Sequence, residues 1–436
     1  MAFAILVPFL LIVALGGGSA RFDTQSVILV RLAAVCFIMA LAFMNGRQLF
    51  AGPKAPLWFA LAAAGLVALQ LVPLPPGIWT ALPGRGFVAE AAAVAGIDQP
   101  WRPITLTPGP TMNSLAALIV PIAALLGVRL LGRWGRQRLI VLIFGLILVS
   151  AVLAMLQVAD GPNSPLRTYR FTNEEFGVGL FANRNHQAML IATGFPILAY
   201  FNERYGVPGR KLPVALLTIG AGLFLLTTIL VTGSRMGLLL GAIAIALSAL
   251  NLAASRRISR RSLLGAAAAT AAVAGTLLAL GLSQAKSLSR LMTLDPSDDL
   301  RFVLLGDFMK MAKEFFPFGS GFGSFPYVYP HFERLETMSP KYVNHAHDDL
   351  LEIVIEGGLA PLLLLVLFLG WLVARAFRTY RGRDGSDAES AARLGIAATV
   401  LLLLGCLTDY PLRTPLMAVL FVCYCSFALP SRATRN

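Results

Sequence analysis

The 436-residue sequence is 57% hydrophobic and only 13% charged, with a mean hydropathy of +0.74. A soluble domain cannot cover its surface with so few charged residues, so the composition predicts a polytopic membrane protein. The formal net charge of +14 comes in part from basic loops between apolar segments, so it does not indicate nucleic-acid binding.

The apolar segments predict an all-α protein with about 12 transmembrane helices, because about 20 apolar residues span a bilayer as a helix. They are too long and too uniformly apolar for barrel strands. In chain order they centre on Ile5–Gly16, Val27–Met44, Leu57–Val72, Leu115–Leu131, Leu139–Val158, His186–Phe201, Pro213–Thr232, Gly237–Leu252, Leu263–Leu282, Gly358–Phe377, Leu394–Leu407 and Thr414–Leu429. The first ends in GGGSA, as a signal peptide does, but it lacks a basic start, so we interpret it as a span. We expect a single membrane domain over residues 1–436.

Basic residues orient the predicted bundle, because short cytoplasmic loops retain positive charge. They gather in alternate loops: Arg47 and Lys54; Arg129, Arg133, Arg136 and Arg138; Arg204, Arg210 and Lys211; Arg256, Arg257, Arg260 and Arg261; Arg375, Arg378, Arg381 and Arg383; Arg432 and Arg435. These loops and both termini are therefore predicted to be cytoplasmic. The longest hydrophilic segments, 73–112, 159–184 and 283–346, then lie on the outer face, where we expect the function to reside.

Arg235 is the only charged residue between Leu212 and Ser255. This segment exceeds one membrane crossing, and Gly233-Ser234 near its middle predicts a turn on the outer face. Arg235 would stand at the mouth of this hairpin, where two interpretations are open. It is either a snorkelling anchor to lipid phosphates or a cation that pairs bidentately with an anionic substrate.

The outer segment before the tenth predicted span contains a second arginine candidate, Arg301. It opens a stretch whose apolar residues recur at helical spacing: Phe302, Leu305, Phe308, Met309 and Ala312. This pattern predicts an amphipathic helix on the membrane surface or over the spans. Arg301 is either an anion ligand or the partner of a neighbouring aspartate. The glycine-rich turn Gly319–Ser324 is either a phosphate-binding loop or a flexible connector, and the connector is favoured because a strand does not precede it.

The stretch NHAHDDLLEIVIEGG contains the histidine candidates, His345 and His347. Helical spacing to Leu351 and Ile355 predicts that His347 lies in the first turn of a helix entering the membrane. A neutral histidine there accepts a proton from a hydroxyl nucleophile near neutral pH. The two histidines and the aspartates after them would alternatively hold a metal, although their spacing alone is weak support.

In this order, Arg235 in TGSRMG, Arg301 in DDLRFVLLGDFMKMAKEFF and His347 in NHAHDDLLEIVIEGG resemble the O-antigen ligase and polymerase superfamily. QLVPLPPGIW, WRPITLTPGPT and FANRNHQA also resemble segments of its exopolysaccharide-type members, so the resemblance covers most of the chain from about Gln70 onward. The family pattern at the histidine usually reads His-Asn-Asp-Tyr-Leu-Glu. This chain has Asp348 for the asparagine and Leu350 for the tyrosine, which puts an amide contact to the sugar in doubt.

The resemblance implies a bacterial inner-membrane glycosyltransferase with a GT-C-like fold, a large helical periplasmic segment between spans 9 and 10, and a periplasmic active site. Such enzymes transfer a glycan from undecaprenyl diphosphate to an acceptor hydroxyl without a metal or other cofactor. Ligases use lipid A–core as acceptor, whereas polymerases use another lipid-linked glycan. The implied partners are donor, acceptor and membrane lipid, with a chain-length co-polymerase as a further candidate.

The resemblance also implies roles for the candidate residues. Arg235 and Arg301 would stabilise the charge that develops on the leaving diphosphate, and His347 would activate the acceptor hydroxyl for an in-line, inverting attack. Further candidates for substrate binding are Asn183, Arg184, Asn185, His186, His345, Asp348 and Arg413. At the start of the sixth span, Asn183 or Asn185 would alternatively cap the helix. Arg413 is either a weaker member of the site or an interfacial anchor.

Two rival functions come from other classes. About 12 helices also suit a transporter or a flippase of lipid-linked glycans, but the sequence shows no convincing repeat and no charged residue at a span's midplane. A scaffold for a polysaccharide export machine would not need arginines and histidines gathered on one face. The sequence therefore favours a glycosyltransferase, with ligase and polymerase both open.

Overall fold

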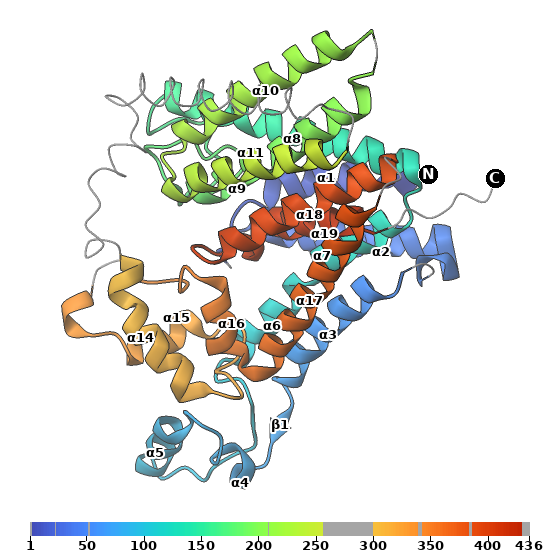
Figure 1. Cartoon of the computed structure of the whole chain (residues 1–436). Coiled ribbons are helices and arrows are strands. Elements are labelled where there is room, and N and C mark those ends of the chain that lie inside the picture. The colour runs from blue at the N-terminus through green and yellow to red at the C-terminus, as the bar shows by residue number, and fades with distance from the viewer. Residues whose placement is uncertain are drawn as a thin grey trace.

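The computed structural model is almost entirely helical (Figure 1). It describes residues 2–21, 23–50, 53–207, 209–255, 300–338, 342–382 and 386–429, without the side chains of residues 47, 50 and 300–302. The predicted ninth span, Leu263–Leu282, lies outside the described residues. The all-α fold that the composition predicts is confirmed for the described part, where the β structure is a single two-stranded sheet.

Among the described residues, seven segments are long and apolar enough to cross a membrane. They are α2 (Ser26–Asn45), the run of α6 (Pro108–Ala117) and α7 (Ile119–Arg129), α8 (Arg133–Ala159), α10 (Lys211–Val231), α11 (Arg235–Ala254), α17 (Leu359–Arg381) and α18 (Asp387–Cys406). Three shorter apolar helices are α1 (Ala2–Gly16), α3 (Ala55–Leu69) and α19 (Pro415–Phe427). The protein is thus a multi-pass membrane protein, and the expected number of about 12 spans stays a prediction.

The predicted sixth span forms α9 (Arg184–Tyr205), which is not among the seven candidates. This helix packs against α8, α10, α11 and α18, and most of its residues are buried. It carries buried polar side chains that bond to its neighbours, such as Gln187 to Ser150 and Thr193 to Tyr424. A helix enclosed by other helices does not contact lipid, so its composition need not be strongly apolar.

The predicted hairpin between Leu212 and Ser255 is confirmed by α10 and α11. Gly233 has φ +62°, a left-handed conformation suited to glycine, and a Cβ there would lie 2.4 Å from the Phe176 ring. Ser234 caps α11 by accepting a hydrogen bond from the Gly237 amide at 2.9 Å. This turn therefore places Arg235 at the first residue of α11.

A smaller core forms beside the main bundle from α14 (Leu300–Phe315), α15 (Phe325–Val328) and α16 (Asp349–Gly357), which lie close together in Figure 1. The helix predicted after Arg301 is confirmed as α14. Its buried stripe differs in part from the predicted one and comprises Leu304, Phe308, Met311, Ala312 and Phe315. Leu305 and Met309, which belong to the predicted apolar stripe, are 43% and 45% exposed, because α14 turns the adjacent stripe toward α16.

The hydrophilic segment 73–112 forms a small unit with β1 (Pro73–Leu74), β2 (Arg102–Pro103), α4 (Pro76–Trp79) and α5 (Gly86–Val94). Pro73 pairs with Pro103 in an antiparallel register. The fully buried Arg85 joins this unit to the glycine-rich turn, since it donates hydrogen bonds to the carbonyls of Pro83, at 2.8 Å, Ile104, and Gly319, at 2.8 Å.

The glycine-rich turn Gly319–Ser324 is packed rather than free. A Cβ at Gly319 would lie 2.2 Å from the Glu356 carbonyl oxygen, and one at Gly321 would lie 1.9 Å from the Thr105 hydroxyl oxygen. The amides of Gly323 and Phe325 both donate to the Glu356 carboxylate at 3.0 Å. The interpretation as a flexible connector is therefore wrong, and these two amides bind a carboxylate of the protein itself.

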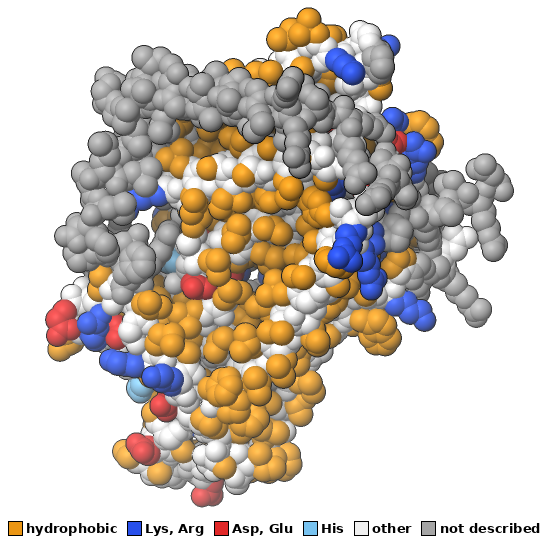
Figure 2. All heavy atoms as spheres, viewed as in Figure 1, with side chains coloured by type: hydrophobic (Ala, Val, Ile, Leu, Met, Phe, Trp, Pro, Cys, Tyr) orange, Lys and Arg blue, Asp and Glu red, His pale blue; other side chains and the backbone are white. Residues whose placement is uncertain are grey.

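Charged side chains are distributed unevenly over the face drawn in Figure 2. On the right-hand side, where α1 begins in Figure 1, Lys and Arg gather with few acidic neighbours. At the lower left, where α14 lies, basic and acidic side chains are mixed. Between these ends the visible surface is mainly hydrophobic, as expected for a surface in contact with lipid.

Candidate functional site

A fully buried carboxylate, Asp409, lies at the centre of the candidate site, in the turn between α18 and α19. Its Oδ2 accepts hydrogen bonds from Asn185 Nδ2 at 2.7 Å and from Asn183 Nδ2 at 3.2 Å. Its Oδ1 accepts one from the Tyr410 amide at 3.0 Å. Asp409 therefore joins the start of α9 to the turn that follows α18.

Two histidines lie against the Oδ1 atom of Asp409. His347 Nδ1 is 3.4 Å away and His186 Nε2 is 3.7 Å away. The Tyr410 ring contacts both of them, with centroid distances of 5.0 Å to His347 and 5.3 Å to His186. The His186 side chain is only 1% exposed, whereas that of His347 is 35% exposed. His347 is therefore the member of this pair that a substrate can reach.

The charge of Asp409 follows from its surroundings. Burial alone would raise the pKa of Asp409, but the His186 and His347 rings, whose nitrogens lie 3.7 and 3.4 Å from Oδ1, outweigh it and hold the pKa well below its usual range. The carboxylate therefore stays ionised near neutral pH. A buried carboxylate behind an imidazole orients the ring and stabilises the imidazolium that forms when it accepts a proton.

The backbone of His347 is strained. Its φ of 52° makes it the non-glycine residue with positive φ among those described, and such a conformation costs about 1–3 kcal/mol. The helix after it, α16, starts at Asp349 with Asp348 as its N-cap. The prediction that His347 lies in the first helical turn is therefore wrong, because α16 begins two residues later, at Asp349.

Asp348 and His345 hold this strained turn in place. Asp348 Oδ1 accepts hydrogen bonds from the amides of Leu350 at 2.9 Å and Leu351 at 3.1 Å. His345 Nδ1 lies 2.8 Å from Glu352 Oε1, and its ring lies 4.3 Å from that of Tyr410. Both predicted binding residues thus have partners within the protein that fix the position of His347.

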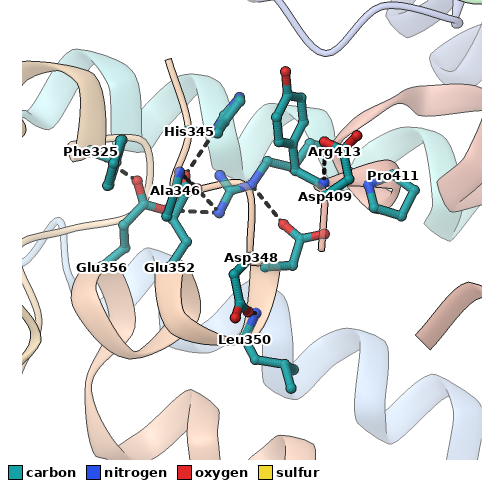
Figure 3. Close-up of polar contacts among 12 residues, drawn as sticks. Phe325, His345, Ala346, Asp348, Leu350, Glu352, Glu356, Asp409, Pro411 and Arg413 are labelled. Atoms are coloured by element: carbon teal, nitrogen blue, oxygen red, sulfur yellow. Dashed lines mark hydrogen bonds and ion pairs between the residues drawn. The ribbon is translucent and has the colours of Figure 1, made fainter. Parts of the chain in front are cut away.

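A second cluster lies beside the first and is centred on Arg413 (Figure 3). The guanidinium lies 3.0 Å from Asp349 Oδ1, 3.1 Å from Glu352 Oε1 and 3.3 Å from Glu356 Oε2. Glu352 Oε2 also accepts a hydrogen bond from the Ala346 amide at 2.8 Å. Arg413 therefore ties the turn before α19 to α16, and its charge is compensated by the three carboxylates.

The three carboxylates differ in how firmly they hold their charge. Burial raises the pKa of Asp349 to about 6, despite the nearby Arg413. Burial likewise raises the pKa of Glu356. For Glu352, burial acts in the same direction, but Arg413 and His345 outweigh it and lower the pKa. The negative charge opposite Arg413 therefore resides first on Glu352.

Replacing Glu352 by glutamine should destabilise the protein by about 2–3 kcal/mol at about pH 7.5, because it leaves buried charge on Arg413 less compensated. Asp349→Asn should change the stability by less than about 1 kcal/mol there, because it keeps the size and shape of the side chain. The measurement is unfolding of the detergent-solubilised protein. A larger loss for Asp349→Asn than for Glu352→Gln would contradict this assignment of charge.

The raised pKa of Asp349 also predicts how the stability of Asp349→Asn, relative to the wild type, depends on pH. Because the folded-state pKa of Asp349 lies near 6, above the ordinary value of 3.8, ionising this group costs folding free energy above about pH 6. That cost disappears as the pH falls toward about 4. Any stability that Asp349→Asn gains over the wild type should therefore be largest above about pH 6 and absent near about pH 4.

The turn that carries Arg235 is joined to Asp409 through one side chain. Ser234 Oγ donates to Asn185 Oδ1 at 2.9 Å, and Asn185 Nδ2 donates to Asp409. Arg235 is partly exposed and has no acidic partner among the described residues. It stands beside the amide-rich start of α11, so cation and helix dipole both favour an anion here. The Arg184 guanidinium lies 4.1 Å from the Phe176 ring, which abuts the same turn.

The structure brings together most of the residues that the sequence analysis singled out. Those around Asp409 and Arg413 are Asn183, Asn185, His186, His345, His347 and Asp348, with Arg184 and Arg235 at the adjoining turn. The backbone of Arg301 lies near the start of α14, but its side chain is outside the described set, so its role stays a prediction. In the described part of the chain, no group of three or more His, Cys, Asp or Glu residues is placed to hold a metal.

Sequence reasoning missed Asp409, the residue on which the site converges. Asp349, Tyr410 and Ser234 were also passed over as site residues. A usable signal was present, because Asp409 lies in the same short outer loop as Arg413, directly after an apolar helix where an ionisable residue is costly. The predicted alternative that Asn183 or Asn185 caps the helix is confirmed for Asn183, which caps α9 and also bonds to Asp409.

Comparison with known proteins gives one match to a family. Residues 220–368 match the family described as O-antigen ligase. The matched stretch contains Arg235, Arg301 and His347 and ends within α17. No curated protein matches the chain.

Proposed function

We propose that this chain, whose residues 220–368 match the O-antigen ligase family, is an enzyme that transfers a glycan from undecaprenyl diphosphate to an acceptor hydroxyl at the periplasmic membrane face. The acceptor is lipid A–core, and the reaction inverts the anomeric centre without a metal. The observation that carries the proposal is the buried Asp409 behind the partly exposed His347, joined through Asn185 to the turn of Arg235.

His347 is the base in this proposal. Its Nδ1 faces the ionised Asp409, which leaves Nε2 as the ring nitrogen for the acceptor hydroxyl. When the hydroxyl attacks the anomeric carbon, its proton passes to His347 and the bond to the diphosphate oxygen breaks on the opposite side. Asp409 stabilises the imidazolium that results.

Arg235 binds the leaving diphosphate. Breaking the glycosidic bond places negative charge on the diphosphate oxygens, which fixed cations stabilise in a site of low water content. Arg235 offers a planar fork of donors beside the start of α11, and Arg184 supplies a second guanidinium near the same turn. Arg301 is expected to contribute from α14.

The proposed orientation places both termini in the cytoplasm. It is supported by the loop pattern of Lys and Arg and by the basic right-hand side of the face in Figure 2. The Asp409 cluster adjoins the α10–α11 turn, at the other end of α10 from the basic residues Arg210 and Lys211. The catalytic groups then face the periplasm, where lipid-linked glycans are used.

The alternative within the family is a polymerase of O-antigen or exopolysaccharide, which uses a second lipid-linked glycan as acceptor. Donor and base residues would be the same in both reactions. The test is transfer by the full-length protein in detergent, with undecaprenyl-diphosphate glycan, EDTA, and either lipid A–core or more lipid-linked glycan. Product on lipid A–core supports the ligase, a ladder of longer lipid-linked glycan supports the polymerase, and loss of product in EDTA would refute metal independence.

In this assay Arg235→Gln should lower kcat/KM about 100-fold, the usual scale for losing one donor to a developing negative charge. The kcat/KM of Arg235→Lys should lie between those of the wild type and Arg235→Gln, because lysine keeps the charge but loses the bidentate geometry. Arg210→Gln is the matched control. Arg210 is an exposed arginine at the start of α10, at the end of this helix that lies away from the Arg235 turn. Equal effects of Arg235→Gln and Arg210→Gln would show that Arg235 is only an interfacial anchor.

A further inference from the structure

A cavity of about 550 Å³ lies at the opposite end of the bundle from Asp409. The same two helices reach both places. α9 starts beside Asp409 and carries Arg204 near its end, while α18 starts at Asp387 in the cavity wall and ends before Asp409. The cavity is therefore separate from the proposed catalytic site by the length of these helices.

The cavity wall is strongly basic. Three arginines line it, Arg133, Arg136 and Arg204, together with one carboxylate, Asp387. Asp387 is shared by two of them, since its Oδ2 pairs with Arg133 Nη2 and lies 3.5 Å from Arg204 Nε. A single carboxylate cannot balance three guanidinium groups, so the wall keeps an excess of positive charge.

The arginines also present donors for an anion. Among the described residues, the buried Nε of Arg204 has no hydrogen-bond partner. Arg136 is held in the wall by the carbonyls of Ser426, at 3.2 Å, and Leu429, at 2.7 Å. Guanidinium groups fixed in this way bind phosphate oxygens through paired hydrogen bonds.

The remaining wall and the position of the cavity identify the kind of anion. Phe427 and Leu429 form an apolar side next to the arginines. Arg133 begins the candidate span α8 and Asp387 begins the candidate span α18. Ends of spans lie at the membrane–water interface, where phospholipid phosphates lie beside the first carbons of the acyl chains.

We propose that this cavity binds the headgroup phosphate of an anionic phospholipid. The arginines bind the phosphate, and the part of an acyl chain nearest the glycerol packs along Phe427 and Leu429. Asp387 competes with the phosphate for Arg133 and Arg204. The site is distinct from the glycan-transfer site, and its occupancy does not depend on the proposed reaction.

The test is binding of phosphatidylglycerol to the full-length protein in neutral detergent, measured by native mass spectrometry against phosphatidylcholine. The wild type should retain phosphatidylglycerol in preference to phosphatidylcholine. Arg133→Gln/Arg204→Gln should weaken phosphatidylglycerol binding about tenfold, the scale of a lost charge-assisted hydrogen bond. Asp387→Asn should strengthen phosphatidylglycerol binding, because it removes the carboxylate that competes with the phosphate. General damage to the fold would weaken binding instead.

The control is Arg138→Gln, because Arg138 is an exposed arginine of α8 that does not line the cavity. It should leave binding unchanged. Equal retention of the two lipids, equal binding by the double variant and the wild type, or weaker binding by Asp387→Asn would each overturn the proposal. If inorganic phosphate displaced phosphatidylglycerol when present at the same concentration, that result would also overturn the proposal. The cavity would then be assigned to a soluble phosphate.

Discussion

Replacing His347 by asparagine should lower kcat for glycan transfer by about 100- to 10,000-fold, the range that a positioned base contributes. Asparagine is the informative replacement because it tolerates the left-handed conformation of this position, φ 52°, better than most residues. The turn into α16 should therefore persist. The loss should appear mainly in kcat rather than KM, because His347 acts on the proton of the acceptor and not on the diphosphate.

The matched control for this prediction is His331→Asn, since His331 is an exposed histidine outside the cluster around Asp409. It should leave kcat unchanged. Folding is checked by comparing the thermal unfolding of both variants with that of the wild type. If His347→Asn kept a third or more of the wild-type kcat while folded, His347 would not be the base and the acceptor would be activated elsewhere.

Asp409→Asn is expected to lower kcat by about 100-fold or more, because an amide cannot stabilise the imidazolium of His347 as a carboxylate does. It also disturbs the bonds from Asn183 and Asn185, since the new amide has one acceptor oxygen instead of two. Asp409 touches no substrate in the proposal and acts through His347, so it is a positioning residue.

A double-mutant cycle separates this positioning role from a purely structural one. If Asp409 acts through His347, then His347→Asn/Asp409→Asn should be no slower than His347→Asn alone. Losses that multiply would contradict the role and leave Asp409 as a structural residue only. Stability provides a second readout. Because the folded-state pKa of Asp409 is lowered, its carboxylate stabilises the fold above its ordinary pKa of 3.8, and this contribution is lost only in stronger acid.

Several local features of the fold could be predicted from the sequence. The turn at Gly233-Ser234 follows from the length of the apolar segment and from a glycine and a serine near its middle. The helix after Arg301 follows from apolar residues at helical spacing. The limits of the outer segment 159–184 also agree with the structure, where α8 ends at Ala159 and α9 starts at Arg184. Each of these features depends on residues close together in the chain.

Other features depended on contacts that no local pattern contains. Hydropathy does not distinguish a helix that faces lipid from one enclosed by the bundle, so it predicts α9 as an ordinary span. Periodicity predicts that α14 is a helix but does not show which of its apolar residues face α16, so the exposure of Leu305 and Met309 does not follow from the sequence. The glycine-rich turn was interpreted as free, although its amides bind Glu356, which lies 33 and 31 residues from the two donors along the chain.

By itself, the sequence determined that this protein is a multi-pass helical membrane protein and where its main hairpin turns. These conclusions rest on the cost of exposing backbone and charge to lipid, which acts on each segment separately. Only the tertiary structure decided that Asp409, 62 residues after His347 by their numbering, stands behind that histidine and that Arg413 pairs with α16. Such partnerships arise because buried charges must find partners in space, and the distance along the chain does not constrain which partners they find.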